Sequence, residues 1–246
     1  MDSVDITLPG FNVLVDVKGD TSGVALSLAG NQWFVVDELV HYLNSLGFTV
    51  YVETIPPGLV RERALGKALR VGALTVNLRP EIVSLPPQML AGIPTVDTFE
   101  YAESEVAVAY QGKPVEDLCD IRNRRVAIPN PVTEGIGALL RDMYSEACGD
   151  YLELITKGSV YLTRIHHREI PELMRHGVVD AGVMWVTEAR YWGLPYFAPS
   201  TGRRGKLVFA LLPWATDKAR QLFRQLRSQK VKEIYEKYGF KWIAQP

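Results

Sequence analysis

The feature that most constrains this sequence is a regular alternation of short apolar runs with segments of helical periodicity. In the N-terminal part, strands are predicted over residues 24–28, 48–52 and 71–76, and helices over residues 33–43 and 59–69. Two successive strand–helix–strand units of this kind build a mostly parallel sheet with helices on both faces. The pattern therefore predicts an α/β fold.

The alternation is interrupted near the middle of the chain and then starts again. Pro80, Pro86 and Pro87 restrict residues 79–92 to short helical pieces. Extended segments are predicted over residues 94–98 and 105–110, with a change of direction in the acidic run 100–105. Further strands are predicted at 125–128, 160–165, 179–184 and 207–212, and helices at 136–147, 170–176, 186–192 and, as a pair, within 216–238.

This layout predicts two Rossmann-like lobes with mixed sheets, joined by a hinge of two extended crossovers. One lobe comprises residues 1–108 and 200–246, and the other is the inserted segment 109–199. Ligands of open α/β sheets bind beyond the carboxyl ends of the strands, where helix N-termini point. We therefore expect a ligand cleft between the lobes, formed by strand-to-helix loops.

Composition excludes several classes of function. Lys and Arg number 27 against 28 for Asp and Glu, so the net charge of −1 provides no field for a nucleic-acid partner. A nucleophile motif such as G-x-S-x-G is missing from the sequence, so no catalytic residue and no enzymatic activity are predicted. No metal site or cofactor is predicted either, and a monomer is expected. No apolar run approaches the ~20 residues that span a bilayer.

Cys119 and Cys148 are the two cysteines of the sequence. Their spacing fits neither a redox C-x-x-C pair nor a zinc site. Free, buried thiols are the preferred interpretation, because cysteine is among the most buried residue types, and a single disulfide is the alternative. The chain does not begin with an export signal, so it is expected to be extracytoplasmic if a signal was removed and cytoplasmic if the chain is complete.

Four strand-to-helix loops, residues 27–32, 54–58, 130–137 and 166–169, carry small or polar residues. Such residues suit an oxyanion, because helix N-termini offer free N–H groups and partial positive charge. The alternative for each loop is that its polar residue caps its own helix. The candidate ligand-binding residues are Ser27, Asn31, Gln32, Thr54, Asn130, Thr133, Glu134, Gly135, His166, His167, Arg168 and Trp185.

Four of these residues add chemistry that an oxyanion site built from uncharged donors does not require. Glu134 must point away from an anion, bind a protonated ligand or pair with a cation. His166 and His167 are adjacent and diverge in direction, which favours hydrogen-bond donation to a ligand, or a structural role, over chelation of a metal. Trp185 follows a predicted strand, where it closes a pocket wall or packs in the core.

Several segments together resemble a known family: Leu28-Ala-Gly-Asn-Gln-Trp33, Pro129-Asn-Pro-Val-Thr-Glu-Gly-Ile-Gly137, Leu162-Thr-Arg-Ile-His-His-Arg-Glu169, Asp180-Ala-Gly-Val-Met-Trp185 and the ending from Ala219 to Phe240. They are similar to the substrate-binding proteins of ABC importers, nearest to the molybdate/tungstate-binding-like branch with a type II periplasmic-binding fold. The resemblance runs from about Gly23 to Phe240.

The resemblance implies capture of a small oxyanion such as molybdate, tungstate or sulfate by lobe closure, followed by recognition of the closed form by a membrane permease. It implies ligand contacts from Ser27, from Thr54, from the backbone of Val132 to Gly135 and from the backbone of His167 and Arg168. Trp185 stands where molybdate binders place a tyrosine. A small organic acid or a metal complex bound through the histidine pair, and a regulatory or enzymatic domain on the same fold, remain the alternatives.

Overall fold

The structure is a computed structural model that describes residues 7–8, 11–12, 16–71, 74–132, 134–163, 168–200 and 203–244. The chain forms two compact units. Unit 1 consists mainly of Asn12–Glu103 and Lys206–Pro246, and unit 2 mainly of Ser104–Gly205. The short strands β1 (Thr7–Leu8) and β2 (Phe11–Asn12) form a two-stranded sheet of their own.

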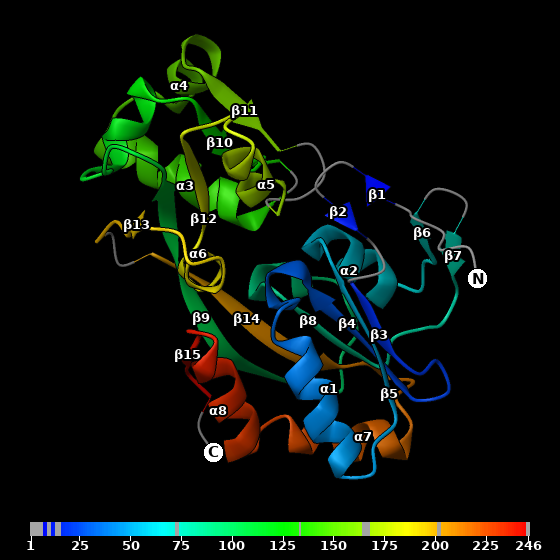
Figure 1. Ribbon diagram of the computed structural model, residues 1–246. Coiled ribbons are helices and arrows are strands. Elements are labelled where there is room, and N and C mark those ends of the chain that lie inside the picture. Colours follow the sequence, from blue (N-terminus) through cyan, green and yellow to red (C-terminus); the bar gives the residue numbers. More distant parts are fainter. Residues whose placement is uncertain are drawn as a thin grey trace. The chain divides into compact units, whose positions relative to one another are not determined.

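Unit 1 contains a mixed sheet whose strand order is β14 (Arg204–Leu211), β8 (Ile82–Leu85), β4 (Val24–Ala29), β5 (Val50–Ile55) and β3 (Val17–Gly19) (Figure 1). The central strand β4 is parallel to both β5 and β8, whereas β3 and β14 run antiparallel to their neighbours. All six residues of β4 are buried, as expected for a strand covered on both faces.

Side chains alternate between the two faces of β4. Leu26 and Leu28 pack in one cluster with α1 (Val36–Ser45), α7 (Asp217–Gln225) and α8 (Gln229–Lys237). The opposite face is covered by α2 (Pro57–Ala64), whose Val60 packs with Val83 of β8. The sheet of unit 1 is therefore enclosed between α1, α7 and α8 on one side and α2 on the other.

Unit 2 is built around the strand order β11 (Val160–Leu162), β10 (Val126–Ile128), β12 (Ala181–Trp185) and β9 (Asp97–Tyr110), with β13 (Tyr196–Phe197) also paired to β9. The strands β11, β10 and β12 are parallel, and β9 is antiparallel to β12. Helices α3 (Gly135–Ala147) and α4 (Tyr151–Lys157) cover one face, and α5 (Glu169–Arg175) and α6 (Val186–Tyr191) the other.

The predicted α/β class with mixed sheets is confirmed. The chain passes from unit 1 to unit 2 within β9, after Glu103, and returns within β14, after Gly205. The lobe boundaries drawn from the sequence, residues 1–108 and 200–246 against 109–199, stay a prediction, as do the hinge and the cleft.

The predicted break in the acidic run 100–105 is wrong, because β9 continues through it as one strand of 14 residues. The acidic side chains are paired with cations from distant segments. Glu100 binds Lys206, with 2.9 Å between Oε2 and Nζ, and Glu103 binds Lys241 at 2.9 Å. Lys241 lies in β15 (Lys241–Trp242), which pairs with β9. A run of like charges thus forms a stable strand because opposite charges lie across from it.

Residues 71–76 do not form the predicted third strand of the main sheet. Instead β6 (Leu69–Val71) and β7 (Leu74–Val76) pair antiparallel as a separate two-stranded sheet. The third strand is β8, inside the stretch that the prolines were expected to restrict to helical pieces. Pro80 and Pro86 flank β8, and Pro87 opens the 3₁₀ helix η3 (Pro87–Leu90), so no proline interrupts the strand.

The preference for free thiols is also wrong, because Cys119 and Cys148 form a disulfide with a Cα–Cα distance of 5.3 Å. Cys119 lies at the start of the 3₁₀ helix η4 (Leu118–Asn123), where the Asp117 carboxylate accepts a hydrogen bond from its N–H. Cys148 ends α3. The two elements pack together around Leu118, which places the sulfurs within bonding reach.

In the part of the chain that the structure describes, no helix combines the length and the apolar character needed to cross a membrane.

Candidate functional site

The first predicted loop begins where β4 ends and the 3₁₀ helix η2 (Gly30–Gln32) starts. Asn31 is 8% exposed, and its side chain makes no hydrogen bond with the residues that the structure describes. Its Oδ1 is completely buried. A buried amide without partners costs about 1–3 kcal/mol, so this loop keeps an uncompensated polar group at the carboxyl end of a parallel strand.

Gln32, next in the same turn, is placed differently. Its side chain is buried, and both ends of its amide are engaged inside unit 1. Nε2 donates to Ser84 Oγ at 3.1 Å, and Oε1 accepts from the hydroxyls of Tyr101 and Tyr235 at 2.5 and 2.7 Å. No capacity remains for a ligand, so we leave Gln32 out of the proposed contacts.

Ser27 lies inside β4 and not at its end. It faces away from the side on which Leu26 and Leu28 pack, and its neighbours in register are Glu53 of β5 and Val83 of β8. Its Oγ is buried and has no hydrogen-bond partner among the described residues. Because this face of the sheet is covered by α2, we also leave Ser27 out of the proposed contacts.

Thr54 belongs to β5 and is buried. Its hydroxyl donates to the carboxylate of Asp16, with 3.0 Å between Oγ1 and Oδ1. The backbone N–H of Thr54 also donates to Asp16 O, at 2.8 Å. A threonine hydroxyl has one hydrogen, so Thr54 is already committed as a donor and does not suit an oxyanion. Asp16 was missed because nothing in the sequence links it to Thr54.

In unit 2 the loop between β10 and α3 is held by Thr163, which sequence reasoning also missed. Thr163 Oγ1 accepts the backbone N–H of Asn130 at 3.0 Å and donates to the carboxylate of Glu134. The N–H of Glu134 in turn donates to Asn130 O at 2.9 Å. Thr163 directly follows β11, but the strand predicted over residues 160–165 included it, so it was not counted among the loop residues.

Asn130 and Gly135 leave groups available in this loop. Asn130 Oδ1 accepts the N–H of Val132 at 2.9 Å, whereas its amide nitrogen makes no hydrogen bond within the described chain. Gly135 is the first residue of the 13-residue helix α3, and no atom lies within 4 Å of the position that a Cβ would take. The N–H groups of the first turn of α3 have no acceptor within the helix, and they lie at its positive end.

Gly137 fixes how closely α3 approaches this loop. A Cβ at Gly137 would lie 2.3 Å from the carbonyl oxygen of Pro129. The helix therefore packs directly on the backbone before Asn130, which a larger residue would prevent.

Glu134 is the N-cap residue of α3 and is buried, with 3% exposure. Its side chain does not cap the helix but binds Thr163. The negative charge is stabilised by the N-terminal end of α3, so the objection that the sequence raised to a purely anionic ligand stands in the structure as well.

Trp185 ends β12 and packs inside unit 2. A Cβ on Gly205 would lie 2.1 Å from Trp185 Cη2, so the indole lies against the backbone of Gly205. The role of Trp185 as a pocket wall stays a prediction. Arg168 is the half-buried N-cap residue of α5. Thr133, His166 and His167 lie outside the described residues.

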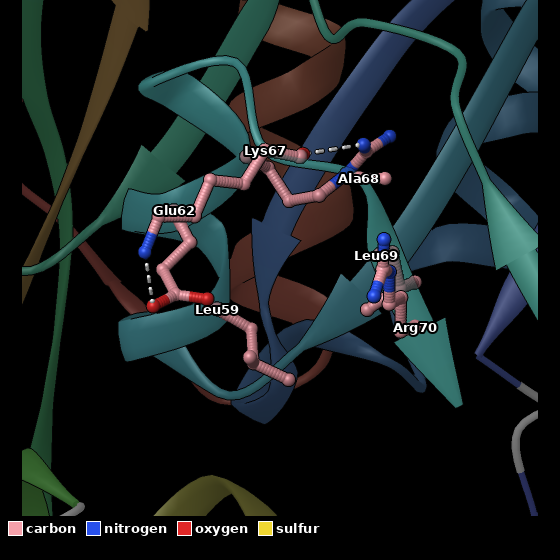
Figure 2. A pocket seen from close by; sticks show the side chains of 7 residues that line it. Leu59, Glu62, Lys67, Ala68, Leu69 and Arg70 are labelled. Atoms are coloured by element: carbon pink, nitrogen blue, oxygen red, sulfur yellow. Dashed lines mark hydrogen bonds and ion pairs between the residues drawn. The ribbon is translucent and has the colours of Figure 1, made fainter. Parts of the chain in front are cut away.

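Two hollows occur in unit 1 away from these loops. One, of about 420 Å³, is lined by Leu59, Glu62, Arg63, Lys67, Ala68, Leu69 and Arg70 (Figure 2). Lys67 Nζ binds Glu62 Oε1 at 3.0 Å (Figure 2). Arg63 donates a hydrogen bond to Lys67 O. The other, of about 380 Å³, lies between Gly19 and Val50. Neither contains a residue predicted to bind the ligand.

One group of candidate metal ligands stands out among the described residues, formed by Asp117, Cys119 and Cys148. Both sulfurs are joined in the disulfide and are not thiolates, so this group lacks the ligands that zinc requires.

Comparison with known proteins decides the family. The family of bacterial extracellular solute-binding proteins matches residues 48–241, which is most of the chain. The chain belongs to this family. A search of curated proteins finds no match. The membership confirms the resemblance that the sequence segments indicated.

Several solved structures share the fold of this solute-binding protein. The periplasmic molybdate-binding protein of Azotobacter vinelandii has a TM-score of 0.70 at 15% identity, covering 90% of this chain and 100% of its own. Peb3 from Campylobacter jejuni has a TM-score of 0.66 at 15% identity, covering 89% and 99%. The sulfate-binding protein SubI of Mycobacterium tuberculosis H37Rv has a TM-score of 0.68 at 16% identity, covering 90% and 86%. At these identities the likeness establishes the periplasmic-binding fold.

Proposed function

We propose that this solute-binding protein captures a small tetrahedral oxyanion, such as molybdate, tungstate or sulfate, and delivers it to an ABC permease. The observation that carries the proposal is the buried side-chain amide of Asn31. Its buried amide has no hydrogen-bond partner among the described residues, at a strand end where α/β proteins bind ligands. An amide presents its NH₂ or its oxygen by a half-turn about χ2, so Asn31 can donate to an anion.

The loop at the start of α3 supports the same chemistry. Its available groups are the amide nitrogen of Asn130 and the first-turn N–H groups that begin at Gly135, all of which are uncharged donors. Neutral donors together with a helix N-terminus hold an oxyanion without a counter-charge. We propose contacts from Asn31, Asn130 and Gly135, and from Thr133, His166, His167 and Arg168 as the sequence predicts.

The named ligands of similar structures share one chemical group. Two of the neighbours are named for molybdate and sulfate, and a PEB3 structure at 16% identity and a TM-score of 0.69 is described with bound L-phospholactate. All three ligands carry a tetrahedral oxyanion. This common chemistry favours an oxyanion as the ligand of the present protein.

A small organic acid that carries a phosphate group is a second candidate. Two observations favour it: the buried Glu134 beside the proposed loop, and the phospholactate ligand of PEB3. A ligand hydroxyl or a protonated oxygen would donate to Glu134, which a fully ionised oxyanion does not do. Replacing His166 and His167 together with alanine tests the histidine pair, which this candidate requires as donors.

An extracytoplasmic location fits the family and the disulfide. The family is described as extracellular, and disulfides persist in oxidising compartments such as the periplasm. We propose that the chain works there as a binding protein without catalytic activity, its partners being the ligand and a membrane permease.

Thermal unfolding across a panel of anions tests the proposal. The panel contains molybdate, tungstate, sulfate, phosphate and phospholactate, with chloride and acetate as controls. A ligand at 100 times its Kd adds about 2.7 kcal/mol of stability, which raises the Tm of a chain of this size by about 5–10 °C. We expect at least one tetrahedral anion to give such a shift. A flat response to all of them removes the ligand assignment.

A further inference from the structure

Gln32 is the centre of a buried hydrogen-bond network in unit 1. Its Nε2 donates to Ala29 O at 3.3 Å and to Ser84 Oγ at 3.1 Å. Its Oε1 accepts from Tyr101 at 2.5 Å and from Tyr235 at 2.7 Å. The four side chains show no exposed surface. The network thus connects η2 to β8, to β9 and to α8, three elements that are distant from η2 in sequence.

The direction of every hydrogen bond in this network is fixed by chemistry. The oxygen of Gln32 only accepts, so the single hydrogen of Tyr101 points to it. Ser84 Oγ and the Tyr101 hydroxyl lie 2.8 Å apart, and because the tyrosine hydrogen is used, Ser84 is the donor of that pair. Ser84 then accepts from Gln32 Nε2. Gln32, Ser84 and Tyr101 form a closed ring in which each member donates once to the next.

Tyr235 completes the network from outside the ring. It supplies the second hydrogen bond to Gln32 Oε1, so both acceptor positions and both N–H groups of the Gln32 amide are satisfied. Burial raises the pKa of the Tyr101 and Tyr235 hydroxyls well above the usual value for a phenol, with the neighbouring Tyr235 adding to the effect on Tyr101. Both phenols therefore remain protonated donors throughout the physiological pH range.

We infer that Gln32 is a positioning residue, which holds the turn that carries Asn31 while making no contact with the ligand itself. Asn31 is adjacent in η2 and has no hydrogen bond of its own with the described chain, so nothing in its side chain fixes it. The ring and Tyr235 instead hold the backbone of Asn31. Gln32 Nε2 donates to Ala29 O, and Ala29 and Gln32 lie on either side of Asn31 in the chain. The inference rests on the proposed function in assigning Asn31 to the ligand.

The role extends to residues far from the proposed site. Tyr235 lies in the C-terminal helix α8. Tyr101 lies in β9, two residues before Glu103, after which the chain leaves unit 1. Neither belongs to a loop that was predicted to bind a ligand. Removing the Tyr235 hydroxyl is expected to loosen the turn without changing the shape of the core.

The test compares Tyr235→Phe and Ser84→Ala with Tyr42→Phe. Tyr42 is the matched control because its hydroxyl also binds within unit 1, 3.3 Å from Ser228 Oγ at the start of α8, but makes no hydrogen bond to Gln32, Ser84 or Tyr101. Amide hydrogen exchange of residues 29–35 is measured in the ligand-free proteins, and titration with molybdate and with phosphate measures affinity. Loss of one hydrogen bond of about 1 kcal/mol predicts exchange about fivefold faster at the turn and affinity about fivefold weaker for Tyr235→Phe.

Three outcomes separate the inference from the proposed function. Unchanged exchange at residues 29–35 in both Tyr235→Phe and Ser84→Ala overturns the inference, whatever the affinity. Faster exchange with unchanged affinity for an anion that the unmodified protein binds also overturns it. If the unmodified protein binds none of the anions, the proposed function fails, and the exchange rates still decide whether the network holds the turn.

Discussion

Arg63 and Glu53 form an ion pair inside unit 1, with 2.7 Å between Nε and Oε1 and 3.3 Å between Nη2 and Oε2. Their side chains are 2% and 1% exposed. The remaining donors of Arg63 bind the carbonyl oxygens of Lys67, Val76 and Leu78, so all five of its N–H groups are used. Arg63 thereby joins α2 to β5 and to the residues around β7.

Removing one member of this pair leaves an uncompensated buried charge, which costs about 3–5 kcal/mol. We therefore predict that Arg63→Met lowers the free energy of unfolding by this amount, and that Glu53→Gln combined with Arg63→Met recovers part of the loss. Urea unfolding measures both. The control is Glu62→Gln, which breaks the exposed pair with Lys67 and is expected to cost under about 1 kcal/mol. If Arg63→Met and Glu62→Gln lower the free energy of unfolding equally, the prediction is contradicted.

The disulfide is expected to stabilise unit 2 by limiting its unfolded state. Cys119 and Cys148 are 29 residues apart, and a loop of this length corresponds to about 3–4 kcal/mol. We predict that Cys119→Ser with Cys148→Ser lowers stability by this amount in guanidinium unfolding. Treatment of the unmodified protein with dithiothreitol should have the same effect. If reduction leaves the unfolding midpoint unchanged, the disulfide has no part in the stability of unit 2.

Gly137 and Gly135 form a matched pair in the first turn of α3. Gly137→Ala places a Cβ 2.3 Å from Pro129 O, whereas Gly135→Ala meets no atom within 4 Å. We predict that Gly137→Ala lowers stability by about 1–3 kcal/mol through the forced displacement of the loop, as overpacking does. Gly135→Ala is expected to raise stability by about 0.4–1 kcal/mol, because it restricts the unfolded chain. Thermal unfolding measures both variants. Similar unfolding midpoints for the two would contradict the close packing of Gly137 on Pro129 O.

Asp180 makes the stability of unit 2 depend on pH. Hydrogen bonds from Arg125, at 3.0 Å between Nε and Oδ2, lower the pKa of the Asp180 carboxyl below its usual value. A carboxyl with a lowered folded-state pKa stabilises the fold above its unfolded pKa, about 3.9, and loses this contribution as pH falls through the folded pKa. We predict a Tm that declines below about pH 4, and a shallower decline in Asp180→Asn. Parallel Tm profiles for the two proteins from pH 6 to pH 2.5 would exclude the contribution.

The sequence predicted those elements whose periodicity is local. Strands β4, β10 and β12 and helices α1, α3 and α6 lie close to the predicted ranges because each carries its own apolar pattern. β9 was divided because the partners of Glu100 and Glu103 are more than 100 residues away in the chain. The disulfide was missed for a related reason, since Cys spacing alone does not show that η4 packs on the end of α3.

The sequence selected candidate loops, but it could not show which of their side chains are already engaged by other residues. Asn31 and Asn130, which the sequence selected as polar residues in strand-to-helix turns, keep hydrogen-bonding groups that no described residue uses, and their ligand contacts stay a prediction. Gln32 carries the same local signal as Asn31, yet its amide is used by Ser84, Tyr101 and Tyr235. Thr54 is used by Asp16 in the same way. Sequence indicates which side chains can bind a ligand, whereas tertiary contacts decide which remain free to do so.

The central claim is that uncharged donors, Asn31 among them, hold an anion. Isothermal titration calorimetry tests it most directly, with the anion that gives the largest thermal shift and with the unmodified protein, Asn31→Ala and Asn31→Asp. We predict one anion per chain, affinity weaker by about 10- to 100-fold in Asn31→Ala, as for a hydrogen bond to a charged group, and no measurable binding in the isosteric Asn31→Asp, whose carboxylate repels the anion. Binding by Asn31→Asp with the affinity of the unmodified protein would contradict the account.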